Sequence, residues 1–380
     1  MNKSATIRLN GSVGALDAAA WDALNHDGNP FTSHRFLTLL EQSGSVGGRS
    51  GWTPLPMTLH AGESPDAPML GVVPAYLKAH SQGEYVFDHG WADAWERAGG
   101  SYYPKLQIAV PFTPATGPRV LAADEDVALT LLAAVERFCE SEGLSSAHAT
   151  FVAPEQQALF ERAGWLLRHD IQFHWTNRGY TDFEAFLDSL ASRKRKAIRK
   201  ERARAVEGLE IRDLVGDDIR PEHWDAFWQF YQDTGARKWG TPYLTREAFD
   251  LIGASMGEDV LLMLAFEDGT PVAGALNFIG PDALYGRYWG ALVDKPFLHF
   301  ELCYYRAIDA AIARGLSRVE AGAQGSHKLA RGYEPVRTTS AHFIPHPDFR
   351  RAVADFLRQE SEGIDASKSA LQGMAPFKRG

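Results

Sequence analysis

Three residues that can move protons or hold an anion stand close together near the carboxyl end of the chain. Glu320, His327 and Lys328 lie on either side of Gly322 and Gly325. A carboxylate or an imidazole can take a proton from an ammonium group or give one to a leaving group. Lys328 can hold a phosphate or a carboxylate, and glycine permits close approach of a ligand. The segment 320–328 is the leading candidate for catalysis, and a paired structural carboxylate in an ordinary surface loop is the alternative.

The residues before this segment add four candidates. Tyr288 and Trp289 stand on an expected strand, where they could line a substrate tunnel or, through the phenol of Tyr288, protonate a leaving group; a plain core role is the alternative. His299 and Glu301 stand at the start of the helix that follows. A carboxylate in a first helical turn is stabilised by the helix dipole. Glu301 is therefore either a helix-start residue or a substrate contact, and His299 is a further candidate for proton transfer.

A cation and an aromatic side chain form a third group. Arg237, Lys238 and Trp239 precede Gly240 at the end of an expected helix. This combination of charge and ring predicts a corner that binds the acceptor substrate, with Arg237 and Trp239 as the contacts.

The most biased stretch of the chain is SRKRKAIRKERAR, residues 192–204, which holds eight basic residues and one glutamate. Its apolar residues fall on one stripe of an expected helix over residues 190–206, so the cations cover the remaining surface. A solvated face is one interpretation. The mutual repulsion of the cations favours an anionic partner instead: coenzyme A phosphates, a nucleotide-linked sugar, transfer RNA or anionic lipid headgroups. Arg195, Lys196 and Arg199 are the candidate contacts.

The elements that must position these residues follow from periodicity and turn residues. Asp268 and Gly269 stand between two apolar runs, which is the strongest short-range signal for a β-hairpin. Around this hairpin we expect helices over residues 221–237, 245–255 and 298–314, and strands over residues 283–292, 318–321 and 338–344. This order is that of a mixed α/β unit.

The first half of the chain has a similar order. We expect strands over residues 57–60, 69–80, 85–91, 106–112 and 145–152, and helices from residue 92 and over residues 124–143. The pattern of residues 85–91 matches that of 285–291, and the pattern of 106–117 matches that of 317–328. We therefore predict a tandem duplication: a domain of residues 1–175, and a second domain of residues 176–380 with the expected active site and the basic helix 190–206 at the junction.

Composition excludes several classes of protein. The chain has 39 Lys and Arg against 48 Asp and Glu, a net charge of −9, which opposes loose attachment to nucleic acid or anionic lipid, so any anion site must be local. Its two cysteines, Cys139 and Cys303, are too far apart in sequence for a disulfide framework or a thiolate zinc site. We find no signal-peptide pattern and no long apolar run. A cytoplasmic location is expected, with the inner face of the membrane as a place of peripheral attachment.

Two motifs lack the surrounding secondary structure that their function requires. Gly253-Ala-Ser255-Met-Gly257 has the letters of a nucleophile elbow but follows an expected helix rather than a strand. His342 and His346 are four residues apart, but Pro345 prevents the helix that would bring them together. We expect neither a serine hydrolase nor a metal site.

Two blocks of residues resemble a known family. They are YWGALVDKPFLHFELCYYRAIDAAIARGL with VEAGAQGSHKLARGYEP, and, in the first half, HGWADAWERAGGSYYPKLQIAVPFTPATGPR. These blocks resemble the bacterial predicted N-acyltransferases that are labelled peptidoglycan biosynthesis or recognition proteins. That family is related to the Fem-type peptidyltransferases, and both have the acetyltransferase (GNAT) fold in tandem.

The resemblance implies an α/β, tandem GNAT-like fold and N-acyl transfer. The leading interpretation is transfer from acyl-coenzyme A, as co-substrate, to a primary amine of a lipid or cell-envelope precursor, for example a sphingoid base. The alternatives are a Fem-like peptidyltransferase that uses aminoacyl-transfer RNA, and a non-catalytic protein that binds envelope precursors. The acetyltransferase pyrophosphate motif is matched by Arg287 and Gly290 but fails at its last position, Leu292. Gly322, Gly325, Lys328 and the basic helix are the other expected contacts of the co-substrate.

Overall fold

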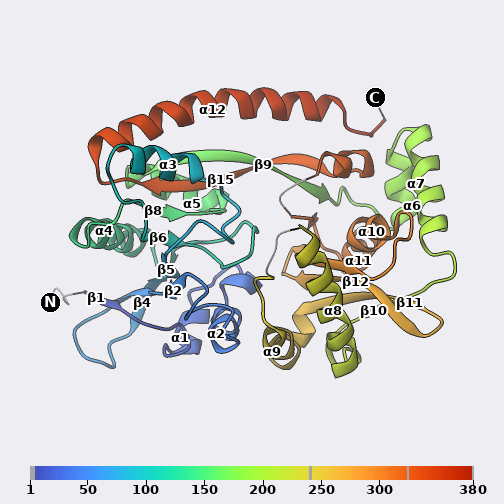
Figure 1. Cartoon of the computed structure of the whole chain (residues 1–380), viewed down its shortest axis with the longest axis horizontal. Helices are drawn as coiled ribbons and strands as arrows, with labels where there is room; N and C mark the ends of the chain where they lie inside the picture. Colours follow the sequence, from blue (N-terminus) through green and yellow to red (C-terminus); the bar gives the residue numbers. More distant parts are fainter. Residues whose placement is uncertain (1–4, 239–241, 323–324, 379–380) are drawn as a thin grey trace. The chain divides into compact units, whose positions relative to one another are not determined.

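The computed structural model describes residues 5–238, 242–322 and 325–378 (Figure 1). The chain forms two compact units. The first contains Met1–Asp170 and Arg337–Asp365, and the second contains Ile171–Val336 and Ala366–Gly380. The predicted boundary between residues 175 and 176 falls inside a strand, and the structure gives residues 337–365, which the prediction placed in the C-terminal domain, to the first unit.

The first unit contains two groups of strands. An antiparallel sheet has the order β1-β3-β4-β7, and a second set has the order β2-β5-β6-β8, with the end of β15 antiparallel to β8. Strands β6 and β8 are parallel. The bounds are β1 Thr6–Leu9, β2 Trp52–Pro54, β3 Met57–His60, β4 Met69–Val73, β5 Ala75–Lys78, β6 Lys105–Ile108, β7 Leu121–Ala122, β8 Ala147–Ala149 and β15 Glu334–Phe343.

Helix α4 covers the core of the first unit. Asp124 caps it by accepting a hydrogen bond from the backbone N–H of Val127, and Leu131 and Val135 are completely buried in the cluster with Leu106 of β6. The helices of this unit are α1 Ala18–Asp22, η1 Pro30–Thr32, α2 His34–Gln42, α3 His89–Arg97, α4 Glu125–Ser141 and α5 Pro154–Arg162.

The second unit is built on a mixed sheet of order β10-β11-β12-β13-β14-β9. The predicted hairpin is confirmed: Asp268 and Gly269 both have positive φ and join two antiparallel strands. Strands β13 and β14 are parallel and are connected by a helix. The bounds are β9 Leu166–Thr176, β10 Glu210–Leu214, β11 Val260–Glu267, β12 Thr270–Ile279, β13 Ala283–Ala291 and β14 Arg318–Glu320.

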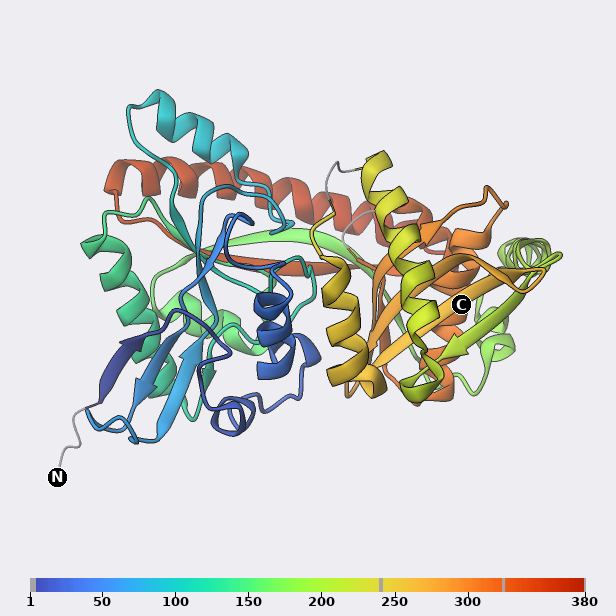
Figure 2. The same cartoon turned by 60° about the horizontal axis from the view of Figure 1, so that its bottom comes forward.

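Helices cover both faces of this sheet. On one face α8 packs so closely on β13 that a Cβ on Gly290 would lie 2.2 Å from the carbonyl oxygen of Phe230, and Figure 2 shows α8 and α9 across the strands. The bounds are α6 Phe183–Ser189, α7 Ser192–Ala205, η2 Gly216–Asp218, α8 Pro221–Lys238, α9 Arg246–Met256, η3 Gly257–Asp259, α10 Leu298–Phe300, the π-helical turn η4 Glu301–Tyr305, α11 Arg306–Ala313, η5 Ser326–Arg331 and α12 Pro347–Gly373, which begins in the first unit.

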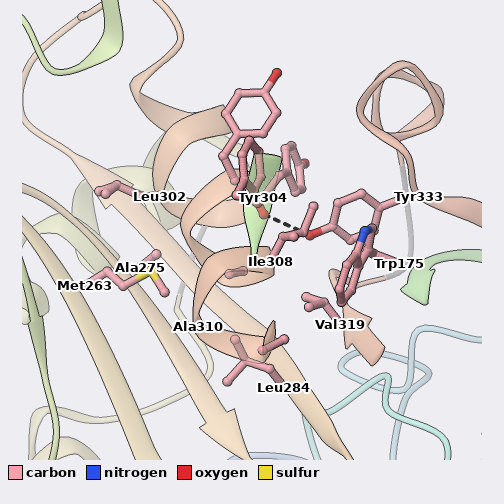
Figure 3. Packing of buried hydrophobic residues seen from close by; sticks show 14 of the residues in the cluster. Trp175, Met263, Ala275, Leu284, Leu302, Tyr304, Ile308, Ala310, Val319 and Tyr333 are labelled. Carbon is pink, nitrogen blue, oxygen red and sulfur yellow. Dashed lines mark hydrogen bonds between the residues drawn. The ribbon is translucent and has the colours of Figure 1, made fainter. Parts of the chain in front are cut away.

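The other face carries the main core of the second unit. Leu302 and Ile308, on the helix that connects β13 to β14, pack on Leu284 and Val319 of those strands (Figure 3). The hydroxyl of Tyr333 donates a hydrogen bond to the backbone oxygen of Tyr304 at 3.3 Å. The predicted helix over residues 298–314 is confirmed, with a π-turn that periodicity did not indicate.

One expected strand is wrong. Residues 85–91 form a loop followed by the start of α3, because Tyr85 has a φ of 59° and Glu84 and Asp88 turn inward to Lys105. The predicted match of residues 106–117 with residues 317–328 pairs β6 with the wrong strand of the second unit. Strands β6 and β8 have the same parallel relation as β13 and β14, so β6 corresponds to β13.

Candidate functional site

The candidate site begins where two parallel strands separate. Strands β13 and β14 pair only over Ala283–Tyr285 and Arg318–Glu320. Beyond this point β13 continues to Ala291 alongside β12, whereas β14 ends. In the described part of the chain, the edge of β13 after Tyr285 has no strand on this side. Such an edge can pair with an extended molecule that carries amide groups.

Glu320 is the last residue of β14, and its carboxylate is held at one oxygen only. The Nε of Arg318 donates to Oε1 at 2.9 Å. Oε2 lies 3.8 Å from Nε2 of His174 and has no hydrogen-bond partner among the described residues. The side chain is buried. A buried carboxylate oxygen that remains open can accept a proton from a substrate.

The face of the sheet that carries Glu320 also carries two tyrosines. Tyr285 pairs with Glu320, and a β-bulge at Arg287 places Tyr288 on the same face as Tyr285. The Tyr288 ring lies against Tyr231 of α8, with centroids 5.2 Å apart. Burial raises the pKa of the Tyr288 phenol, so it stays protonated at neutral pH and can donate to a departing group.

The predicted pyrophosphate turn is not formed. Arg287 and Gly290 lie inside β13, and the next helix begins only at Leu298. Gly290 pairs with Gly274 of β12. Because glycine has no side chain, α8 can pack directly against Gly290. Gly290 belongs to the hydrogen-bonded ladder of β12 and β13 and not to a helix N-terminus.

Lys328 fixes the loop that follows β14. It is buried, and its Nζ donates hydrogen bonds to the backbone oxygens of Ala321 at 2.6 Å and Gly322 at 2.9 Å. Burial lowers the pKa of Lys328 to about 8. Gly322 and Gly325 have φ values of +77° and +119°, which favour glycine. The recorded bonds of Lys328 therefore position the end of the strand that carries Glu320.

His327 is exposed and belongs to a set of rings around the start of the connecting helix. Its Nε2 lies 2.9 Å from the hydroxyl of Tyr304, and its ring centroid lies 5.6 Å from that of Phe300 and 6.2 Å from that of His299. His299 contacts Trp289 of β13 at 5.2 Å. We call Trp289, His299, Phe300, Tyr304 and His327 the ring cluster.

The ring cluster and Glu320 lie on opposite faces of the sheet. Tyr304 packs in the core with Val319, the neighbour of Glu320 on β14, and alternation along the strand places Glu320 on the other face. A molecule that passes between β13 and β14 would meet the ring cluster on one face and Glu320 with Tyr288 on the other. The predicted catalytic residues therefore form two groups, one on each face of the sheet.

Glu301 is occupied by a structural ion pair. Its carboxylate is 2% exposed and accepts two hydrogen bonds from Arg202 of α7, at 3.0 Å to Nε and 2.8 Å to an NH2 that also binds Asp309. Burial raises the pKa of Glu301 and Arg202 opposes this rise. The predicted substrate contact of Glu301 therefore competes with a buried pair that holds the π-turn.

The cations of α7 divide into two sets. Arg195 pairs with Asp188 at 3.2 Å, and Arg199 pairs with Glu184, so these two predicted co-substrate contacts face acids of α6. Lys196 is exposed on the other side of the helix. The solvated interpretation thus accounts for part of the basic segment and leaves a separate exposed set.

Two further predicted residues are not placed. Trp239 lies outside the described residues, and Arg237 is described only as part of α8, without its side chain. The predicted acceptor corner remains a prediction.

Sequence reasoning missed His174 and Tyr304. His174 reaches Glu320 because β9, far away in sequence, pairs with β14, and no local motif marks it. Tyr304 reaches His327 from the π-turn, which shifts the register of the helix. An adjacent Tyr-Tyr pair at a helix start was the only available signal.

Two cavities in the first unit do not suit a thioester. One has a volume of about 40 Å³ and is lined by Phe87, Phe151, Arg168 and Ser340 among others, which is room for a few waters. Another, of about 300 Å³, has Asp124, Glu125 and Glu155 on its wall, which would repel phosphates. We therefore base the site on strand geometry and the open carboxylate rather than on cavity volume.

Residues 5–238, 242–322 and 325–378 contain no group of three potential metal ligands placed to share an ion. None of the helices described there is long and apolar enough to cross a membrane.

Solved structures share this fold. FemX matches with a TM-score of 0.55 at 11% identity, over 89% of this chain and 98% of FemX. L-PGS from Bacillus licheniformis matches with a TM-score of 0.53 at 10% identity, over 90% and 97% of the two chains. A tandem GNAT protein from the clavulanic acid biosynthesis pathway gives 0.47 at 11% identity, over 90% and 99%. The predicted mixed α/β fold class is confirmed by the fold shared with FemX and L-PGS. The parallel pair of β6 with β8 in the first unit repeats that of β13 with β14 in the second, as the predicted tandem duplication requires.

The family follows from the sequence. The family model for FemAB-like proteins, described as peptidoglycan biosynthesis/recognition, matches residues 12–379. The chain belongs to this family, as the resemblance of its two blocks indicated. No curated protein matches its sequence.

Proposed function

We propose that the second unit is an N-acyltransferase that moves an acyl group from acyl-coenzyme A to a primary amine of a lipid or cell-envelope precursor. The observation that carries this proposal is the open Oε2 of Glu320 at the point where β13 and β14 separate. Amine acylation needs a neutral amine, and a buried base beside an unpaired strand edge meets that need. Family membership supports a role in the cell envelope.

In the proposed reaction Glu320 accepts a proton and Tyr288 donates one. Oε2 of Glu320 takes a proton from the substrate ammonium, and the free amine attacks the thioester carbonyl. Backbone N–H groups at the edge of β13 beyond Tyr285 stabilise the oxyanion. As the C–S bond breaks, the phenol of Tyr288 gives its proton to the departing thiolate, and the nitrogen gives its second proton to the resulting phenolate, which restores Tyr288. The products are an amide, coenzyme A and the proton that Glu320 later releases to water.

The ring cluster suits an acceptor or donor with an apolar chain. Trp289, His299 and Phe300 are only partly buried, and partly exposed rings on a site rim bind hydrocarbon well. A long-chain amine such as a sphingoid base is therefore the proposed acceptor class. His327, whose Nε2 lies 2.9 Å from the hydroxyl of Tyr304, is proposed as a contact of that chain and takes no proton in this reaction.

The test is turnover of acyl-coenzyme A with a long-chain amine by wild type and by Glu320→Gln. Loss of the base should lower kcat by about 100-fold or more, with a smaller change in KM. Glu210→Gln is the matched control, because Glu210 is exposed and pairs only with its neighbour Arg212 on β10. Equal activity of Glu320→Gln and Glu210→Gln would remove Glu320 from the mechanism.

A Fem-like transfer from aminoacyl-transfer RNA is the second candidate, and the exposed cations of α7 favour it. Calorimetry with coenzyme A, acyl-coenzyme A and transfer RNA at two salt concentrations separates the two. The acyltransferase proposal predicts coenzyme A binding with weak salt dependence, whereas steep salt dependence with RNA supports the rival. Binding of neither, with retention of a muropeptide or lipid, supports a non-catalytic binding protein.

A further inference from the structure

Helix α7 is tied on its inner side to both segments that carry the ring cluster. Arg202 binds Glu301 of the π-turn. Glu201 accepts hydrogen bonds from the hydroxyl of Tyr305, on the same turn, and from Arg331 of η5 at 2.9 Å. Ile198 and Ala205 are buried beneath the helix. The helix is therefore a fixed part of the site and not a detached arm.

The outer side of α7 is a continuous basic stripe. Arg193, Lys196, Lys200 and Arg204 recur at intervals of three and four residues and are all exposed, so they share one face. The stripe covers about 16 Å along the axis. Ala197 and Ala203 fill the same exposed face, and no acidic residue of α7 lies on it, since Glu201 points inward. We call this face the α7 stripe.

One aromatic side chain, that of Phe297, adjoins one end of the α7 stripe. The guanidinium of Arg204 lies 6.0 Å from the ring centroid of Phe297, which is only partly buried at the end of the segment 292–297. Leu292, at the start of that segment, is 54% exposed. Cations beside exposed apolar residues are the arrangement of a surface that rests at a lipid–water interface.

We infer that the α7 stripe docks the second unit on anionic lipid headgroups. This inference rests on the proposed function, because it identifies the membrane surface at which the second unit would meet its lipid acceptor. Short alanines between the cations let the long side chains lie along the helix and reach phosphates with their heads. Because the whole chain has a net charge of −9, attachment must come from this local face and must require anionic lipid.

Lipid explains the surface better than RNA does. Each cation near an anionic membrane strengthens binding by a modest factor, so four cations together give a reversible attachment without a deep groove. Single-stranded RNA is held by a basic groove with rings on which bases stack. The α7 stripe is a convex helix face, and the single ring recorded beside its cations, that of Phe297, is not a row of rings on which successive bases could stack.

The experiment is sedimentation with vesicles of phosphatidylcholine alone and with 30% phosphatidylglycerol, for wild type and two double variants. Arg193→Glu with Lys200→Glu reverses the α7 stripe. Arg351→Glu with Arg358→Glu, two exposed residues of α12, changes the net charge equally and is the control. Wild type and control should bind the anionic vesicles alone, and the stripe variant should bind at least about tenfold more weakly.

Any of three results would overturn the inference. These are equal vesicle binding by all three proteins, an equal loss of binding in both variants, and wild-type binding to transfer RNA but not to vesicles. Equal thermal midpoints exclude misfolding as the cause of a loss. Turnover of a water-soluble amine separates this inference from the proposed function. It should be the same in wild type and the stripe variant. Vesicle binding without any turnover leaves the docking surface standing and removes the acyltransferase.

Discussion

The chemistry of the site depends on how one carboxylate is held. Glu320 is tied at Oε1 by Arg318, faces a neutral His174 across 3.8 Å, and keeps Oε2 open. Burial lowers the pKa of His174, so this ring does not compete as a cation near pH 7. The same contacts make Glu320 a fixed base.

Lys328 gives a prediction for the pH dependence of stability. Burial lowers its folded-state pKa from 10.5 to about 8, so between these values the unfolded chain holds more protons than the folded one. The free energy of unfolding should therefore rise with pH across this window. Relative to Lys328→Met, wild type should gain up to roughly 3 kcal/mol between pH 7.5 and 10.5.

Denaturant unfolding of wild type and Lys328→Met at several pH values measures this difference. A difference that stays constant, or that falls as pH rises, would show that the amine keeps its ordinary pKa. The two bonds to the backbone of Ala321 and Gly322 should make Lys328→Met the less stable protein throughout.

At the scale of elements, the site depends on how closely α8 approaches β13. A Cβ at Gly290 would meet the backbone of Phe230 at 2.2 Å, and neither main chain can give way easily. Gly290→Ala should therefore lower the free energy of unfolding by roughly 1–3 kcal/mol. Gly286→Ala, in the same strand, is the control, because its Cβ would have only ordinary contacts from 3.4 Å outward.

Denaturant melts of Gly290→Ala and Gly286→Ala test this packing. The account expects the first to be clearly destabilised and the second to be neutral or slightly more stable, since alanine loses less backbone entropy than glycine. A similar effect of both substitutions would mean that α8 does not touch β13 as described.

Sequence patterns predicted most elements of the second unit and little of their chemistry. The Asp268-Gly269 turn and the apolar periodicity of residues 298–314 are local signals, and the structure confirms both. The bulge at Arg287 and the pair of Arg202 with Glu301 depend on partners distant in sequence. The predicted phosphate turn at Gly290 failed because β13 continues through this residue to Ala291 and the next helix begins only at Leu298.

At the level of the two units, the first unit contains a buried charge network that the sequence did not indicate. Lys105 is completely buried between Glu84 and Asp88, with 2.8 Å to the former. This network explains why residues 85–91 are not a strand, which no apolar pattern could indicate. Lys105 pairs with both carboxylates, although Oε1 of Glu84 and Oδ1 of Asp88 have no hydrogen-bond partner among the described residues. We assign the network to folding because its cation is held between the two acids.

Lys105→Met tests that assignment. Loss of the cation leaves two buried carboxylates without their partner, and the free energy of unfolding should fall by roughly 3–5 kcal/mol. Arg162→Met is the control, because its ion pair with Glu125 is more than half exposed and should contribute at most about 1 kcal/mol. A loss below about 1 kcal/mol for Lys105→Met would contradict the structural role.

The most direct test of the central claim is photo-crosslinking with an acyl-coenzyme A analogue that carries a diazirine on its acyl chain, followed by peptide mapping. The account predicts label on residues 286–291 of β13 and around Glu320–Gly322, with competition by unlabelled acyl-coenzyme A. Competed label confined to the first unit, around Phe151 or Glu155, would contradict it and move the site to the other half of the chain.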